Sequence, residues 1–390
     1  MPFKFCPECG RKNVENNKFC PECGTPLDGG TKTKSSSKND FVIEGSRLTK
    51  YNGSDEKVII PKEVVSIENE AFKDNKDIKE LVLNEGLLII HLRAFKGCSS
   101  LKTIVFSKTL KTIENEAFQD CTALRQLTIP DNVEAIYGHT FQGCIALESI
   151  ILPKTTTYIL GGLFYGCISL KEIAVPQNVK GIEEYAFSGC VSLGKVVLNE
   201  GLETIKRNAF QDCTSLTAII LPRSLKRIGS EAFRGCTSLK SLPYFPSEIA
   251  IGRDAFSRCT SLKTVAIPAT VNTISDSHYY NSKGLYFFSF CSSLETVNVP
   301  SNHFTLIAGF EGCTSLKSFV IPKGIEIIDI KAFKDCVSLR EVFIPITVRR
   351  IVGGAFENCQ NLTIKYEGTK EQFDAINKIN FPRNIIVKCR

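Results

Sequence analysis

The sequence has no tryptophan, a single methionine and only four histidines in 390 residues. It also has no run of about 18 apolar residues, the length that a membrane-spanning helix needs. The residues from Met1 to Cys6 lack the basic and then apolar pattern of a secretory signal. We therefore expect a soluble, cytoplasmic protein without a membrane span, with export to the cell surface by a non-classical route as the alternative.

The sequence also lacks a strong excess of positive or negative charge. The chain carries 48 Lys and Arg against 41 Asp and Glu, a net charge of +7 that is spread thinly without a long basic block. So small a bias over so long a chain is not the basic footprint of a nucleic-acid-binding protein. The charge pattern argues against a nucleic-acid partner.

Signatures of catalysis are missing as well. The sequence contains no GxSxG, P-loop, HExxH or dinucleotide-binding motif. None of the histidines (His91, His139, His278 and His303) recurs beside the many cysteines, so a cysteine nucleophile would lack a general base. We predict that the protein is not an enzyme.

Cysteine is the residue in excess, with 17 copies, and four of them form an N-terminal pair of Cys-Pro-Glu-Cys-Gly motifs: Cys6, Cys9, Cys20 and Cys23. Each Cys-x-x-Cys turn directs two thiolates at one tetrahedral cation, and four protein ligands close the coordination shell. We therefore predict one structural Zn²⁺, with iron or redox-active dithiols as alternatives. The segment resembles the zinc-ribbon domains found at bacterial N-termini, and so short a segment needs the metal to fold.

The composition then predicts the domain boundaries. Residues 28–40 contain no apolar side chain, so nothing there repays the entropy of ordering the chain. We expect a zinc ribbon over residues 1–27, a flexible linker over residues 28–40 and a second domain over residues 41–390.

Twelve further cysteines recur at a spacing of mostly 23 residues, and a phenylalanine precedes each of them by three residues. Phe72 adds a thirteenth repeat, with Asn75 in the cysteine position. A period of this length is typical of a solenoid. The repeating cysteines are Cys98, Cys121, Cys144, Cys167, Cys190, Cys213, Cys236, Cys259, Cys291, Cys313, Cys336 and Cys359.

These repeats carry the pattern I-x-I-P-x-x-V-x-x-I-x-x-x-A-F-x-x-C, which resembles the BspA-like class of leucine-rich repeats. The resemblance covers residues 41–390 and implies a mainly β repeat solenoid, a leucine-rich-repeat fold of thirteen turns of about 23 residues. It also implies an N-terminal cap near residues 41–61 and a C-terminal cap near residues 362–390, in which we expect a helix near Glu371 to Lys378. Family members are often surface proteins that bind host or neighbouring-cell proteins.

Within each repeat, alternating Leu and Ile side chains are expected to face inward from parallel strands about 4.8 Å apart. Phe is expected to fill the far side of each coil, and Cys to pack as a small buried hydrophobe. The alternative is a set of disulfides between neighbouring turns. We predict free thiols, because cysteines stacked in one repeated rotamer do not turn toward one another. Cys389 has no assigned role.

The same alternation predicts which side chains point outward onto a concave sheet. The central outward position is apolar in most repeats, whereas its outward neighbours are polar, which suggests a contact surface for a protein. The competing explanation is that Val and Ile simply favour strands. The candidates on this row are Val105, Ile151, Val197, Ile220 and Phe343.

Two irregular repeats supply further candidates. Nine extra residues enter near Ser275 to Gly284, and an earlier repeat reads Pro243-Tyr244-Phe245-Pro246. Insertions in repeat proteins often map to the binding face, and aromatic side chains are strong interface anchors. Packing of these aromatics on the solenoid itself is the alternative. The candidates are Tyr244, Phe245, His278, Tyr279 and Tyr280.

We therefore predict a non-enzymatic, protein-binding scaffold whose solenoid recognises a partner of unknown identity and whose zinc ribbon is a structural or docking module. An adhesin-like surface protein is the first alternative. A nucleic-acid-associated protein that uses the ribbon is the second.

Overall fold

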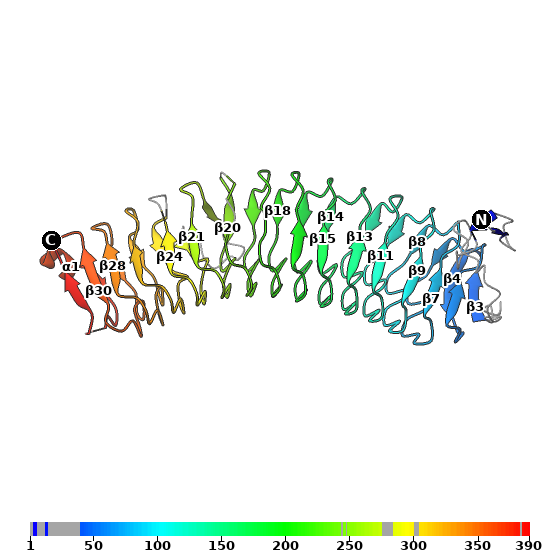
Figure 1. Ribbon diagram of the computed structural model, residues 1–390, viewed down its shortest axis with the longest axis horizontal. Helices are drawn as coiled ribbons and strands as arrows, with labels where there is room; N and C mark the ends of the chain where they lie inside the picture. Colours follow the sequence, from blue (N-terminus) through cyan, green and yellow to red (C-terminus); the bar gives the residue numbers. More distant parts are fainter. Residues whose placement is uncertain are drawn as a thin grey trace.

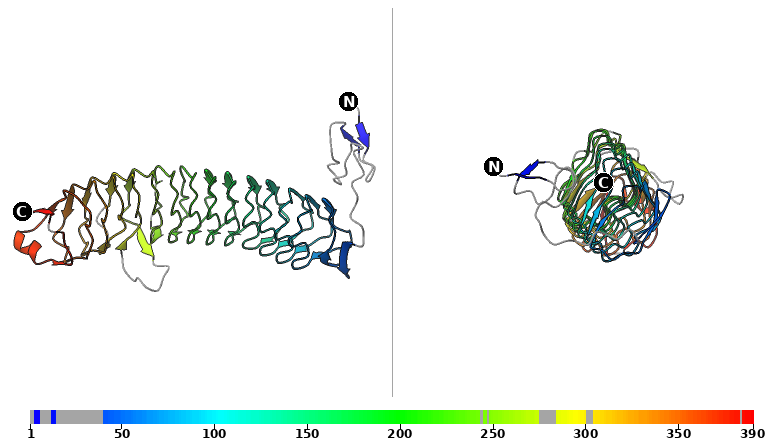
Figure 2. Two further views of the ribbon diagram at one scale, coloured as in Figure 1. Left: turned by 90° about the horizontal axis from the view of Figure 1, so that it is seen from below. Right: turned by 90° about the vertical axis from the view of Figure 1, so that its right-hand side faces the viewer.

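The computed structural model describes residues 3–5, 12–14, 40–242, 245–246, 248–274, 284–299, 304–382 and 384–390. From residue 40 onward the chain winds into an elongated solenoid that follows a shallow arc (Figure 1). The end-on view shows its turns stacked behind one another around one axis (Figure 2). The expected β solenoid is confirmed, and it has about 14 turns.

One long face of the solenoid is a ladder of parallel strands, here called ladder A. Its strands pair one repeat apart, so that Val82 lies opposite Val105 and Ala174 lies opposite Val197. Its strands are β5 (Lys57–Ile59), β7 (Glu80–Val82), β9 (Thr103–Val105), β11 (Gln126–Thr128), β13 (Ser149–Ile151), β15 (Glu172–Ala174), β17 (Lys195–Val197), β21 (Thr264–Ala266), β24 (Thr296–Asn298), β26 (Ser318–Val320), β28 (Glu341–Ile344), β30 (Thr363–Tyr366) and β32 (Ile386–Lys388).

A second parallel ladder, ladder B, is built mostly from two-residue strands. Its strands are divided into groups of five, six and five, and the last division falls between β22 and β23. Its strands are β4 (Arg47–Tyr51), β6 (Ser66–Ile67), β8 (Ile89–Ile90), β10 (Thr112–Ile113), β12 (Ala135–Ile136), β14 (Tyr158–Ile159), β16 (Gly181–Ile182), β18 (Thr204–Ile205), β19 (Arg227–Ile228), β20 (Ala250–Gly252), β22 (Asn272–Ile274), β23 (Gly284–Leu285), β25 (Leu306–Ile307), β27 (Ile327–Ile328), β29 (Arg350–Ile351) and β31 (Asn377–Lys378).

A continuous stack of aromatic rings runs through the core. Thirteen phenylalanines, Phe72 to Phe356, stack on their neighbours with ring centroids 4.7–6.2 Å apart. Tyr51 of the cap takes the Phe position of the first turn, with its ring 5.0 Å from that of Phe72. The expectation that Phe fills each coil is therefore confirmed, and Tyr51 accounts for a turn before the thirteen repeats.

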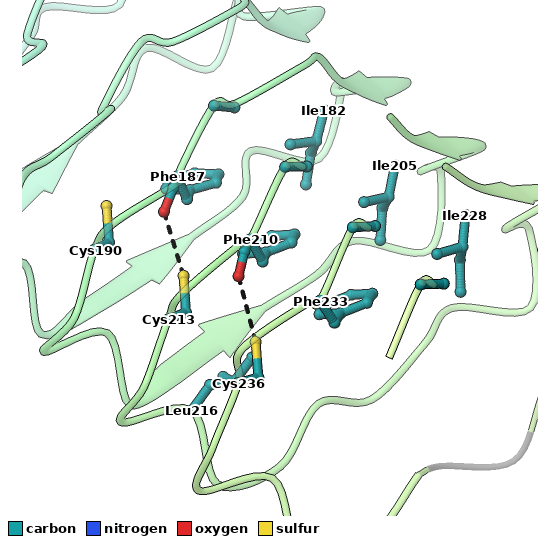
Figure 3. Close-up of a cluster of buried hydrophobic side chains, with 14 of the residues drawn as sticks. Ile182, Phe187, Cys190, Ile205, Phe210, Cys213, Leu216, Ile228, Phe233 and Cys236 are labelled. Atoms are coloured by element: carbon teal, nitrogen blue, oxygen red, sulfur yellow. Dashed lines mark hydrogen bonds between the residues drawn. The ribbon is translucent and has the colours of Figure 1, made fainter. Parts of the chain in front are cut away.

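Beside this stack lies a ladder of buried thiols. Each of the twelve repeat cysteines donates an S–H hydrogen bond to the carbonyl oxygen of the Phe in the preceding turn, as Cys213 does to Phe187 and Cys236 to Phe210 (Figure 3). The Sγ···O distances lie between 3.0 and 3.4 Å. All twelve thiols are free, as predicted, so no disulfide joins neighbouring turns in this part of the chain.

The two ends of the solenoid are closed differently. At the N-terminal end β3 (Phe41–Glu44) and β4 form an antiparallel hairpin whose second strand joins ladder B. At the C-terminal end the only helix among the described residues, α1 (Lys370–Asp374), starts at a capping box made by Thr369 and Gln372. It is shorter than the helix expected near Glu371 to Lys378, because the last residues of that segment instead form β31, which pairs with β29.

A separate antiparallel pair, β1 (Phe3–Phe5) and β2 (Lys12–Val14), precedes the solenoid.

Candidate protein-docking surface

The predicted outward positions of ladder A form a row of exposed apolar side chains, here called the apolar row. It consists of Ile59, Val105, Ile151, Val197, Ile220, Val320 and Phe343, with the half-buried Val82 between the first two. Exposure reaches 63% at Ile151 and 80% at Ile220. In β13 successive side chains point to opposite faces, so Ile150 is buried where Ile151 is exposed. Ile219 and Ile220 show the same alternation of burial.

Parallel pairing aligns the row along the solenoid. Ile59 lies opposite Val82, and Val82 opposite Val105, in consecutive strands. Thr128 lies opposite Ile151 and Ala174 opposite Val197 in the same way. Ile220 follows Val197 by one repeat in a segment that forms no strand, and Phe343 lies further along the same ladder. Ala266 and Asn298 occupy the row between these two apolar parts, and they are exposed as well.

Charged pairs border the apolar row on one side. Two residues before the row position, Glu172 of β15 and Lys195 of β17 form an ion pair at 3.3 Å, and their side chains are more than 60% exposed. Similar cross-turn pairs join Lys171 to Glu148 at 2.6 Å and Lys57 to Glu80 at 3.4 Å. Exposed pairs of this kind add at most about 1 kcal/mol each to stability. Their effect on the surface is to give the apolar row a polar rim.

The aromatic candidates of the irregular repeats are placed differently. Phe245 is buried, with 3% exposure, and packs edge-on against Phe256 with ring centroids 6.1 Å apart. It therefore belongs to the core, and its assignment to the partner surface is wrong. Tyr244, His278, Tyr279 and Tyr280 lie outside the described residues.

A polar hollow of about 510 Å³ is lined by residues that follow β20, β23, β25 and β27 of ladder B. The Tyr286 hydroxyl donates to Asp329 at 3.2 Å, and the Arg253 guanidinium lies 5.1 Å from the Tyr286 ring centroid. Burial raises the pKa of Asp254 in the same hollow. Sequence reasoning did not find these residues, although the long spacing between Cys259 and Cys291 indicated where the repeat is disturbed.

The ladder thiols are not arranged for chemistry. Burial raises the pKa of Cys98, Cys190, Cys291 and Cys359 to about 12, so these thiols are protonated donors at neutral pH. A cysteine nucleophile or metal ligand needs the thiolate. The sulfur atoms therefore serve packing and hydrogen bonding.

The two described histidines make surface contacts. His91 Nδ1 lies 3.1 Å from Glu114, and His139 Nδ1 lies 2.8 Å from the side-chain oxygen of Gln142. Within the described residues no three His, Cys, Asp or Glu side chains form a cluster that could hold a metal ion.

The expected zinc ligands, Cys6, Cys9, Cys20 and Cys23, lie outside the described residues. The strands β1 and β2 pair with Phe5 opposite Lys12, and the segment that joins them contains the first Cys-x-x-Cys motif. Four thiolates at this spacing match the donor set that Zn²⁺ prefers.

No helix among the described residues is long and apolar enough to cross a membrane.

Comparison with solved structures supports the fold. The crystal structure of a leucine-rich repeat protein from Bacteroides ovatus is 28% identical, covers 90% of each chain and has a TM-score of 0.74. A leucine rich cell surface protein from Faecalibacterium prausnitzii is 24% identical over 90% of this chain and 99% of that chain, with a TM-score of 0.51, and shows the fold alone. No curated protein matches the chain.

Comparison with family sequence patterns covers both parts of the chain. A zinc-ribbon domain matches residues 5–27. Six copies of the BspA type leucine rich repeat region match residues 50–171, 158–286 and 284–363, which is most of the chain. With its aromatic stack, thiol ladder and parallel strands, the chain therefore belongs to the BspA-type leucine-rich repeat family.

Proposed function

We propose that the protein is a non-enzymatic scaffold that binds a protein partner through the apolar row of ladder A. The observation that carries this proposal is the row of mostly Val and Ile side chains from Ile59 to Ile220, in which Thr128 and Ala174 are the two other members. A long exposed apolar surface with a polar rim has the anatomy of a protein interface. Strand propensity alone would also favour Val and Ile two residues earlier, where Glu172 and Lys195 stand instead.

The proposal is tested by placing charges in the row. We expect the double variant Val197→Lys, Ile220→Lys to lose at least about tenfold in affinity for a captured partner, because two desolvated cations would be placed in an apolar contact. The measurement is titration of the partner against the immobilised full chain.

A matched control is available on another surface of neighbouring turns. Ile168 and Val191 are 42% and 38% exposed and each follows a ladder cysteine, so Ile168→Lys, Val191→Lys adds the same charge to exposed apolar positions outside the row. This control is expected to bind normally. Equal losses in the two double variants would contradict the role of the row.

We place the protein in a reducing compartment, since its ladder cysteines are free thiols. The alternative is a cell-surface location, which the name of the Faecalibacterium prausnitzii protein states for that protein.

We further propose that the N-terminal ribbon binds one structural Zn²⁺ through Cys6, Cys9, Cys20 and Cys23. Purified chain is expected to contain about one zinc per molecule, and Cys6→Ser, Cys9→Ser is expected to abolish zinc retention, because two thiolates cannot close a tetrahedral shell. Elemental analysis measures the metal, and circular dichroism of the solenoid should not change. A double variant that keeps its full zinc content would refute the ligand assignment.

A further inference from the structure

At the C-terminal end of ladder A, the outward side chains of the row change from apolar to basic. Consecutive strands place Val320, Phe343, Lys365 and Lys388 opposite one another, so two apolar side chains are followed by two basic ones. Figure 1 shows these strands at the end of the solenoid next to α1. Beside them runs a groove of about 720 Å³, which crosses β26, β28, β30 and the end of the chain after β32.

The groove has an apolar part and a cationic part. Val299, Val320 and Phe343 line the first part, and the buried ring of Tyr366 lies between the two parts. Lys388 and Arg390 line the second part; both are exposed, and neither has an ion pair with another residue in the described ranges.

The remaining charges of the groove are already paired. Lys323 contacts Glu367 at 2.9 Å, and Lys365 contacts Glu341 while its ammonium lies 4.8 Å from the centre of the Phe343 ring. Glu367 is the only carboxylate side chain among the lining residues, and it also accepts a hydrogen bond from the backbone N–H of Ile346 at 3.2 Å. The pKa of Glu367 is lowered by its hydrogen bond to Lys323 and, more weakly, by the charge of Arg390, so one carboxylate serves both cations. The lining side chains therefore carry an excess of positive charge.

We infer that this groove binds a short extended segment of the partner that has apolar residues at one end and acidic residues at the other. The inference rests on the proposed protein-binding function and gives the chemistry of one part of the partner. Four strands about 4.8 Å apart span roughly 15 Å, which an extended segment of about five or six residues covers. Apolar side chains contact Phe343, and carboxylates reach Lys388 and Arg390.

Three fluorescein-labelled hexapeptides test the inference with the full chain by fluorescence anisotropy. The first is Leu-Val-Leu-Asp-Glu-Asp, the second replaces its acidic half by Lys-Arg-Lys, and the third replaces its apolar half by Ser-Gly-Ser. We expect the first peptide to bind with a dissociation constant in the micromolar range and the other two to bind at least about tenfold more weakly. Failure of the first peptide to bind at 1 mM overturns the inference.

Charge reversal in the protein makes the test specific. Lys388→Glu, Arg390→Glu is expected to weaken the acidic peptide at least about tenfold and to strengthen the Lys-Arg-Lys peptide. Phe343→Ala is expected to weaken both peptides that carry the Leu-Val-Leu half and to leave the Ser-Gly-Ser peptide unchanged. The matched control, Lys102→Glu, Lys240→Glu, reverses two exposed lysines elsewhere and changes the net charge equally. If the two charge-reversed variants lose equal affinity for the acidic peptide, the inference is overturned. The peptide would then be attracted by the net charge of the whole protein and not by the groove.

The variants also separate this inference from the proposed function. Val197→Lys, Ile220→Lys lies outside the groove and should leave peptide binding unchanged. If that variant loses the partner but the wild type binds no peptide, the groove inference fails and the proposed function stands. If the peptide binds as expected and Val197→Lys, Ile220→Lys keeps its partner, the proposed role of the apolar row fails and the groove inference stands. Self-association through the groove in place of peptide binding also overturns the inference.

Discussion

Raising the pH from 8 to 10 is expected to unfold the solenoid in one steep transition. The cause is the ladder of twelve buried thiols, whose pKa values burial raises, to about 12 for Cys98, Cys190, Cys291 and Cys359. In the unfolded chain the same thiols titrate near pH 8.5. Below that pH both states hold the proton, and the full stability is present.

Above pH 8.5 the unfolded chain releases these protons while the folded chain keeps them. The folded state then binds more protons, so stability falls with rising pH until the folded pKa is reached. Each thiol contributes a loss of up to about 1.4 kcal/mol per pH unit, and twelve together lose roughly 16 kcal/mol per unit. Since domains are typically stable by about 5–15 kcal/mol, we expect unfolding by about pH 10.

The transition is followed by circular dichroism and by thiolate absorbance in the presence of reductant. Because Tyr and Lys begin to titrate in the same range in every variant, the contribution of the thiols is read from the comparison with a control. The control is Cys190→Ala, Cys213→Ala, Cys236→Ala, which removes a quarter of the ladder and should make the loss of unfolding free energy with pH about a quarter less steep. Equal slopes for the two chains, or thiolate absorbance that rises before the fold is lost, would show that the ladder is not the cause.

The second large effect is expected from the aromatic stack. Phe210 is fully buried between Phe187 and Phe233, with ring centroids 5.1 and 5.3 Å away. We expect Phe210→Ala to lower the free energy of unfolding by about 3–5 kcal/mol, because it opens a cavity that the regular turns on either side cannot close. Guanidinium unfolding of the full chain measures the change.

Two comparisons make this result interpretable. Phe343→Ala removes a ring from the surface, where it is 38% exposed, and should cost less than about 1 kcal/mol. Phe210→Leu keeps most of the volume and should cost less than Phe210→Ala. If Phe210→Ala and Phe343→Ala lower the free energy of unfolding by similar amounts, the aromatic stack does not stabilise the packing of the turns.

Sequence periodicity predicted the repeating architecture because each repeat meets the same surroundings. The period alone determined that Phe210 and Cys213 face inward and that Val197 and Ile220 face outward. It did not predict the S–H bond from Cys213 to Phe187, since that contact joins residues 26 apart and depends on where the sulfur points.

Predictions failed where the repeat is irregular. Phe245 stands in the Pro-rich segment between regular turns, where a shift of one residue exchanges the inner and outer faces, and the structure places it against Phe256. The groove beside Phe343 was also missed, because Lys388 and Arg390 reach it only through the pairing of β32 with β30 in the C-terminal cap.

The most direct test of the docking surface is hydroxyl-radical footprinting of the full chain with and without its captured partner. Oxidation of Ile151, Val197 and Ile220 is expected to fall at least about threefold on binding, because burial in an interface excludes water from these exposed side chains. Ile168 and Val191, which follow ladder cysteines outside the row, should be oxidised equally in both states. Protection confined to Ile168 and Val191, with the apolar row unchanged, would contradict the proposed function.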